Sequence, residues 1–195
     1  MPFDHRLQLS VKNIRDQIET PRELPEILLS GGLLDIYGHV DDGQLVRALA
    51  FPWMAILDLF KRDPEAIYQV TDRVWEQIIA ASYDRAGFEE VILTPRSGDH
   101  GRDVVATKNG FCSLRIFDQV KAFKPGHEVS AHDVRALIGV ISVPGVTKGI
   151  MTTTSTFAPR IMQDPTISAY VPSRIELRDR HQLLPFLESL RSAKK

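Results

Sequence analysis

The sequence contains a single cysteine among its 195 residues, so no disulfide can form within the chain and a cysteine-based metal site is not expected. Cys112 lies in an apolar stretch, and we expect it to be a small core residue of a strand. No apolar run approaches the roughly 18 residues that a membrane-spanning helix needs. The first ten residues also lack the basic-then-apolar order of a signal peptide. We therefore expect a cytoplasmic protein without a membrane partner.

Charge is nearly balanced over the whole chain, with a net charge of -1, but it is unevenly distributed. Residues 1–90 contain 9 Lys and Arg against 16 Asp and Glu, whereas residues 91–195 contain 15 against 9. A basic half with a small acidic cluster suits an enzyme that acts on a polyanion, because the cations attract phosphate while the carboxylates hold a metal. The alternative is that the two halves neutralise each other across an internal or dimer interface.

Residues 101–123 predict a β-hairpin. The apolar residues 104–106 are followed by Lys108-Asn109-Gly110, and an apolar run restarts at Phe111. Asn-Gly between two such runs is a strong hairpin signal. The two predicted strands bring residues near 103 and near 120 to the same end of the hairpin.

This end of the hairpin carries a candidate site. Side chains alternate along a strand, so Gln119 and Lys121 project to one side while Asp118 and Val120 project to the other. Asp103 can lie across from the first pair. A carboxylate and an amide oxygen suit Mg²⁺, and a neighbouring ammonium can stabilise charge that develops on a phosphate. The alternative is that Asp103 caps a turn and the other two residues lie on a solvated face.

Two amphipathic helices are predicted before the hairpin. One begins after Pro52 and places its apolar residues at helical spacing, at Trp53, Ile56, Leu57 and Phe60. Asp63-Pro64 then has the form of an N-cap followed by proline. A second helix over residues 72–86 begins after Thr71 and ends before Gly87. Glu76 lies one residue, or about 100°, round from Trp75, at the edge of the inward face of this helix, where it either reaches a site beside the sheet or faces solvent.

Strands and helices alternate after the hairpin. Ser130 and Asp133 have the spacing of a capping box. The predicted segments are a helix through residues 134–141, a strand at 149–151, a short helix within 157–162, a strand at 175–177 and a helix at 183–190 despite Pro185. This order predicts an α/β or α+β sandwich around a central mixed sheet.

Several segments recur in the order and spacing of a known family. They are Trp75-Glu76, Gly87-Phe88, Leu93-Thr94, residues 97–103 (SGDHGRD), 119–121 (QVK), 134–139 (VRALIG), 149–153 (GIMTT) and Phe157-Ala158. From about residue 70 to residue 190 the chain resembles the Mrr-type restriction endonuclease catalytic domain, a branch of the PD-(D/E)xK nuclease superfamily. Trp75 stands where the family usually has Phe, and Arg180 where a glycine is common.

The resemblance implies an α/β fold of the restriction-endonuclease-like type. We expect a three-layer sandwich with a central mixed β-sheet flanked by helices and a small N-terminal appendage. The predicted parts are an N-terminal element at residues 1–51, a helical lead-in at 52–70 and a nuclease catalytic domain at 71–195.

The resemblance also implies an endonuclease that depends on Mg²⁺ or Mn²⁺. Asp103 would be the main metal ligand, with Gln119 where relatives often have Glu, the Val120 carbonyl as a further ligand and Glu76 completing the acidic cluster. Lys121 would position or activate the attacking water. Asp99 would support the site or form a turn. Candidate DNA contacts are Arg96, Arg102, Lys124 and Thr153.

The implied partner is double-stranded DNA, and a homodimer would suit cleavage of both strands. The favoured role is restriction or defence against foreign DNA, including modified DNA. Two alternatives remain open at this stage. One is a DNA repair or junction-resolving nuclease, and the other is a catalytically silent DNA-binding or assembly module.

Overall fold

The computed structural model describes residues 32–95 and 101–192. The chain divides into two units between Gly32 and Leu33, and the structure described below belongs to the second. The expected loop residues Arg96 and Asp99 lie outside the described residues. Within the described ranges no helix has the length and apolar character needed to cross a membrane.

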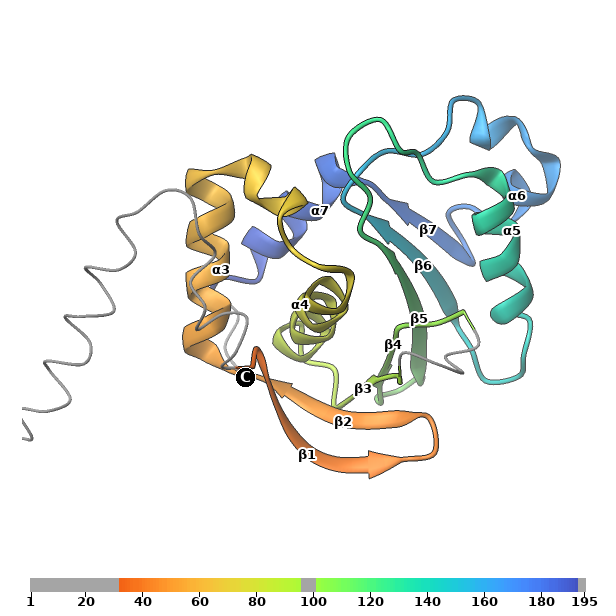
Figure 1. Cartoon of the computed structure of the whole chain (residues 1–195). Coiled ribbons are helices and arrows are strands. Elements are labelled where there is room, and N and C mark those ends of the chain that lie inside the picture. The colour runs from red at the N-terminus through yellow and green to blue at the C-terminus, as the bar shows by residue number, and fades with distance from the viewer. Residues whose placement is uncertain (1–31, 96–100, 193–195) are drawn as a thin grey trace, which may run out of the picture. The chain divides into compact units, whose positions relative to one another are not determined.

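A seven-stranded sheet forms the centre of this unit, and its strands follow one another in space in the same order as in sequence (Figure 1). The strands are β1 (Leu34–Val40), β2 (Gly43–Ala48), β3 (Glu90–Leu93), β4 (Val104–Lys108), β5 (Leu114–Lys121), β6 (Lys148–Thr153) and β7 (Ile175–Arg178). Neighbours from β1 to β5 are antiparallel, whereas β5, β6 and β7 are parallel. The sheet is therefore mixed, as predicted.

Helices cover both faces of the sheet. They are α3 (Ala50–Arg62), η1 (Pro64–Tyr68), α4 (Asp72–Arg85), α5 (Ala131–Val140), η2 (Ile161–Gln163), α6 (Pro165–Tyr170) and α7 (Arg180–Ser189). Helix α4 packs against β2 to β5, and α7 packs against β6, β7 and α3. Helices α5 and α6 lie against the other face and share its buried apolar core (Figure 1). The fold is thus the predicted three-layer α/β sandwich.

The helices before the hairpin form where their apolar spacing predicts them. Helix α3 buries the four predicted apolar residues, and Phe60 stacks on Trp75 of α4 with ring centroids 5.2 Å apart. The Asp63 side chain accepts a hydrogen bond from the Glu65 amide, although the turn that it caps is 3₁₀ rather than α. Helix α4 begins after Thr71, and the Thr71 side chain makes no capping hydrogen bond.

The prediction that Cys112 is a core residue of a strand is wrong. Cys112 and Phe111 are exposed, because β4 ends at Lys108 and β5 begins only at Leu114. A two-residue turn at Asn-Gly would have moved the β4–β5 pairing by three residues. An odd shift exchanges the faces of a strand and would move Phe117 from the apolar core next to α5 to the α4 face, in place of the hydrogen-bonded Asp118. Burial of the strand residues therefore decides the register, and the turn lengthens to match.

Two other expectations differ from the structure. The short helix expected within residues 157–162 is limited to η2, because Phe157 instead forms a bridge with Val129. Helix α6 was not predicted, although Asp164 caps it with the same Asp-Pro signal that precedes η1. Strands β1 and β2 also extend the central sheet, so the sheet begins well before residue 51.

Candidate active site

The Asp103 carboxylate lies against the strand that carries the predicted metal ligands. Its Oδ2 atom accepts a hydrogen bond of 2.7 Å from the amide of Val120. The Asp103 amide donates to the Asp118 carbonyl at 2.9 Å, which continues the β4–β5 pairing one residue beyond the Val104–Asp118 pair. The register therefore sets Asp103 across from Gln119. The structure brings this acid and the Gln-Val-Lys segment together.

Strand β5 turns its side chains alternately toward the two helical layers. Asp118 is buried toward α4, where the Tyr83 hydroxyl donates to its Oδ2 atom at 2.7 Å. The Lys121 ammonium instead lies 3.8 Å from the Asp133 carboxylate of α5. The alternation predicted for this segment is present, and Lys121 belongs to the face that α5 covers.

The backbone of Lys121 is anchored from the neighbouring strand. The Lys121 carbonyl accepts a hydrogen bond of 2.7 Å from the Thr153 hydroxyl, and that hydroxyl also accepts one from the Ser155 amide. Thr153 is fully buried. This candidate DNA contact therefore supports the end of β5 from within the sheet, and its hydroxyl would have to leave both partners to reach a phosphate.

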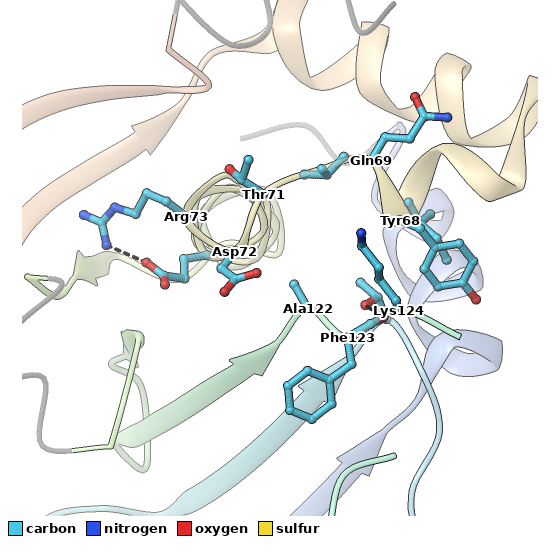
Figure 2. A pocket seen from close by; sticks show the side chains of 12 residues that line it. Tyr68, Gln69, Thr71, Asp72, Arg73, Ala122, Phe123 and Lys124 are labelled. Atoms are coloured by element: carbon cyan, nitrogen blue, oxygen red, sulfur yellow. Dashed lines mark hydrogen bonds and ion pairs between the residues drawn. The ribbon is translucent and has the colours of Figure 1, made fainter. Parts of the chain in front are cut away.

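Glu76 lies on α4 and is connected to Asp103 through two other residues. Arg73 donates to the Glu76 carboxylate at 2.6 Å and to the Thr94 carbonyl at 2.9 Å. The Thr94 amide in turn donates to the Asp103 carbonyl at 3.0 Å. Figure 2 marks the ion pair that extends from Arg73. Glu76 stands at the edge of the site with its carboxylate held by a cation of its own helix.

A cavity of about 910 Å³ adjoins this arrangement. Its wall includes Glu76, Thr154, residues 67–73 at the start of α4, and residues 122–124 directly after β5. Exposed Lys124 extends from the end of β5 toward the connection that carries Gln69 (Figure 2). Asp103, Gln119 and Lys121 are not part of this wall, which along β5 begins at Ala122, the residue after Lys121.

Arg102 forms an ion pair with the turn that connects β1 and β2. Its guanidinium forms an ion pair of 2.7 Å with Asp42, between β1 and β2, and lies 4.9 Å from the centre of the Phe117 ring. Asp42 also pairs with Arg115 at 3.1 Å. Arg102 would have to exchange Asp42 for a phosphate to contact DNA. Arg96 lies outside the described residues.

Asp118, Tyr83, Thr152 and Arg178 form a buried polar cluster on the α4 face of β5, opposite the face to which Lys121 points. Burial raises the pKa of Asp118 to about 7, although Arg178, Tyr83 and Thr152 all favour its ionised form. The negative charge of Asp103 raises this pKa further. Burial and the neighbouring Asp118 also raise the pKa of Tyr83. The strand that carries the candidate site is therefore joined to α4 by hydrogen bonds within the core.

The donor set of the site fits a hard divalent cation. Within the described ranges no three His, Cys, Asp or Glu side chains converge. The ligands predicted from the sequence are the Asp103 carboxylate, the Gln119 amide oxygen and the Val120 carbonyl, all of them oxygen donors. Mg²⁺ keeps several waters and takes only one or two protein carboxylates, so this set suits it. The Oε2 atom of Glu76 is already paired with Arg73, so this carboxylate would share its charge between Arg73 and a bound cation.

Three residues of the site were not predicted from the sequence as part of it. Arg73 precedes Glu76 by three residues, a spacing at which helix side chains meet, so this pair could have been found. Asp133 was predicted only as a helix cap. Thr94 has no sequence signal, because its contact with Arg73 depends on how α4 packs on β3.

The fold and the strand pairing define a class of protein. The helix–strand order from α4 to α7 and the mixed sheet are those of restriction-endonuclease-like α/β proteins. The family model Mrr_cat, described as "Restriction endonuclease", matches residues 67–187, which is more than half of the chain. The chain belongs to this family, and the predicted resemblance is confirmed.

Two solved structures are similar to this chain at low identity. One is described as "MspJI Restriction Endonuclease in Complex with 27-mer Oligonucleotide", with 15% identity over 76% of this chain and a TM-score of 0.42. The other is "DNA modification-dependent restriction endonuclease AspBHI", with 17% identity over 72% of this chain and a TM-score of 0.46. The match spans 34% and 35% of those chains. No curated protein matches the sequence.

Proposed function

We propose that the chain is a divalent-metal-dependent endonuclease that hydrolyses phosphodiester bonds of double-stranded DNA, in restriction or defence against foreign DNA. One observation carries this proposal beyond family membership: the Asp103 carboxylate lies 2.7 Å from the backbone of the Gln-Val-Lys segment. The carboxylate of Asp103 therefore lies at the end of the strand that carries Gln119 and Lys121, and the wall of the cavity begins at the residue after Lys121.

The residues divide the chemistry among them. Asp103, Gln119 and the Val120 carbonyl would hold Mg²⁺ or Mn²⁺, with Glu76 as a further acid. When bound, the metal supplies a hydroxide at neutral pH and stabilises negative charge on the phosphate oxygens. Lys121 orients the attacking water and offers a positive charge to the phosphate. Lys124 would attract the DNA backbone at the mouth of the cavity.

The deciding experiment uses supercoiled plasmid DNA, with and without methylation, in the presence and absence of Mg²⁺. We expect Mg²⁺-dependent nicking or linearisation by the natural protein and its loss in Lys121→Ala. Circular dichroism should show that the variant remains folded. Equal nicking by the natural protein and the variant would contradict the assignment, and a preference for one methylation state would identify the kind of DNA that is recognised.

The ion pair between Arg73 and Glu76 favours a second candidate, a catalytically silent DNA-binding module. Such a module would bind DNA without Mg²⁺, and its DNA binding would not change in Asp103→Ala or Lys121→Ala.

A repair or junction-resolving nuclease is distinguished from the restriction nuclease and from the silent module by adding a four-way DNA junction to the substrates. Preference for the junction over plasmid would favour that role.

We also propose that the active form on DNA is a homodimer, since the two strands of a duplex are related by a two-fold axis. Sedimentation of the protein with a short duplex and Ca²⁺ should show two chains per duplex. A strictly monomeric complex that cuts both strands in one event would contradict this proposal.

A further inference from the structure

Lys121 is held at both ends of its side chain. Its backbone carbonyl accepts hydrogen bonds from the Thr153 hydroxyl at 2.7 Å and from the Thr154 amide at 3.3 Å. Its ammonium lies 3.8 Å from Oδ1 of Asp133. A lysine side chain is otherwise a flexible four-carbon stem with a mobile charge. Fixing both ends limits the directions in which that charge can point.

The Asp133 carboxylate is itself fixed. Asp133 is the third residue of α5, and its Oδ2 atom accepts hydrogen bonds from the Ser130 amide at 3.0 Å and from the Ser130 hydroxyl at 2.6 Å. The bond from the Ser130 amide, together with a bond of 3.3 Å from the Asp133 amide to the Ser130 hydroxyl, forms the capping box of α5. The Oδ1 atom of Asp133 is left directed at Lys121. Burial alone would raise the pKa of Asp133, but the bonds from Ser130 together with the charges of Lys121 and His132 outweigh it and hold this pKa below its ordinary value. The carboxylate is therefore a stationary negative charge at neutral pH.

Helix α5 holds Asp133 on the same face of the sheet as the Lys121 side chain. It follows β5 in the chain and packs on the face to which Lys121 points, with Val134 and Leu137 fully buried. The side chains of Lys121 and Asp133 are 25% and 28% exposed, so water reaches both members of this ion pair. The contact is too exposed to contribute much to folding stability. Its effect is on direction rather than on stability.

We propose that Asp133 is a positioning residue that fixes the Lys121 ammonium for the hydrolysis of DNA. This inference rests on the proposed function, because it assigns Asp133 a role through Lys121 in that reaction. A residue of this kind lowers the cost of arranging the lysine for each turnover, since the side chain no longer has to be ordered when DNA binds.

The first test is single-turnover cleavage of plasmid DNA with protein in excess and Mg²⁺ present. Asp133→Asn keeps an oxygen that can accept from the Ser130 amide but removes the charge that faces Lys121. We expect the maximal rate to fall about tenfold, a typical effect of losing a supporting residue. The protein concentration at half-maximal rate should stay unchanged. Asp133→Glu should recover most of the rate.

A matched control is available on the same side of the sheet. Asp164 also caps a helix and forms an ion pair with Arg135 of α5, but it has no contact with Lys121. Asp164→Asn should therefore lose a comparable amount of thermal stability while its cleavage rate stays within about twofold of the natural protein. An equal loss of rate in Asp164→Asn would show that only helix capping matters, which would overturn the proposal.

A second measurement does not depend on cleavage. In protein labelled with ¹³C at the lysine ε-carbons, the Lys121 signal is identified by its absence in Lys121→Ala. It should shift in Asp133→Asn and remain in place in Asp164→Asn. An unmoved signal, or a full cleavage rate in Asp133→Asn, would overturn the proposal. If the natural protein cuts no DNA, the proposed function fails, and the signal still decides whether Asp133 holds the lysine.

Discussion

At the scale of the residue, the hydrogen bond between Val120 and Asp103 is the contact on which the candidate chemistry depends. It places a carboxylate at the backbone of a strand whose next residue is Lys121. An asparagine at position 103 could accept the same bond through its amide oxygen. The contact can therefore be kept while the charge is removed.

We expect Asp103→Asn to fold normally and to lose cleavage activity by at least about a hundredfold, equivalent to about 2.7 kcal/mol of transition-state stabilisation. The reason is that an amide binds a divalent cation much more weakly than a carboxylate. Single-turnover cleavage and thermal unfolding would measure the two effects. A variant with the natural cleavage rate would remove Asp103 from the site.

Asp133 gives a prediction for stability as a function of pH. Its pKa lies below the ordinary value of 3.8, so its carboxylate stabilises the folded chain above that value. This contribution is lost as the pH falls through the lowered pKa. We expect Asp133→Asn to be less stable than the natural protein near pH 7, with the difference closing as the pH falls through the lowered pKa of Asp133. Urea unfolding at several pH values tests this, and a difference independent of pH would contradict it.

At the scale of the element, the packing of α5 on β6 shows how closely these layers approach. A methyl group at Gly149 of β6 would lie 2.7 Å from Ile141 and 2.9 Å from Ile175, whereas one at Gly139 of α5 would meet no atom within 4 Å. Close packing therefore requires a glycine at position 149, whereas position 139 has room for a side chain. One makes room for a helix, and the other only leaves the helix backbone more flexible.

Alanine at each glycine should give opposite results. Gly149→Ala overpacks the core and should lower the free energy of unfolding by roughly 1–3 kcal/mol. Gly139→Ala should raise it by about 0.5–1 kcal/mol, because alanine favours the helix. Urea unfolding of the two variants would measure both changes. Changes of the same sign would mean that the contact of α5 with β6 differs from the one described.

The sequence predicts elements well where the pattern is local. The spacing in α3, the Asp63 cap and the Ser130–Asp133 capping box depend on residues a few positions apart, and all are present in the structure. The β4–β5 loop could not be predicted, because its length follows from which face of β5 the whole sheet buries. Helix α6 has the aspartate and proline of a helix start, but its six residues are too few for apolar spacing to predict a helix.

The candidate site shows the same division. The sequence could predict that Asp103 lies across from Gln119, because a hairpin fixes which residues of its strands lie opposite each other. The surroundings of Glu76 could not be predicted in full, since its partner Arg73 also binds Thr94 across the packing of α4 on β3. Arg102 was expected to face DNA, yet its contact with Asp42 depends on the β1–β2 turn folding onto the sheet.

At the scale of the whole molecule, the segment that the family model matches is shorter than the compact unit, which begins at Leu33. The family match begins at residue 67, whereas β1, β2 and α3 come earlier in the chain. Trp75 of α4 stacks on Phe60 of α3, and the Ala48 amide at the end of β2 donates to the buried Asp84 carboxylate at 3.1 Å. These contacts tie the earlier elements to the domain that carries the site.

We therefore expect residues 33–195 expressed alone to fold and to unfold in one cooperative transition. Residues 67–187 expressed alone should not, because they would expose the Trp75 surface and leave β3 as an unpaired edge. Circular dichroism and thermal unfolding of the two fragments would compare them. A stable, cooperative 67–187 fragment would show that β1, β2 and α3 are dispensable for folding.

Because every strand pairs with the strand that precedes it in the chain, the sheet can grow in the direction of protein synthesis. Contacts between neighbouring segments form faster than those that close long loops. Asp103 can therefore meet Val120 while the later part of the chain is still being translated. Lys121 receives its partners Asp133 and Thr153 only afterwards, so a chain interrupted before that point would hold the acid in place and leave the lysine unrestrained.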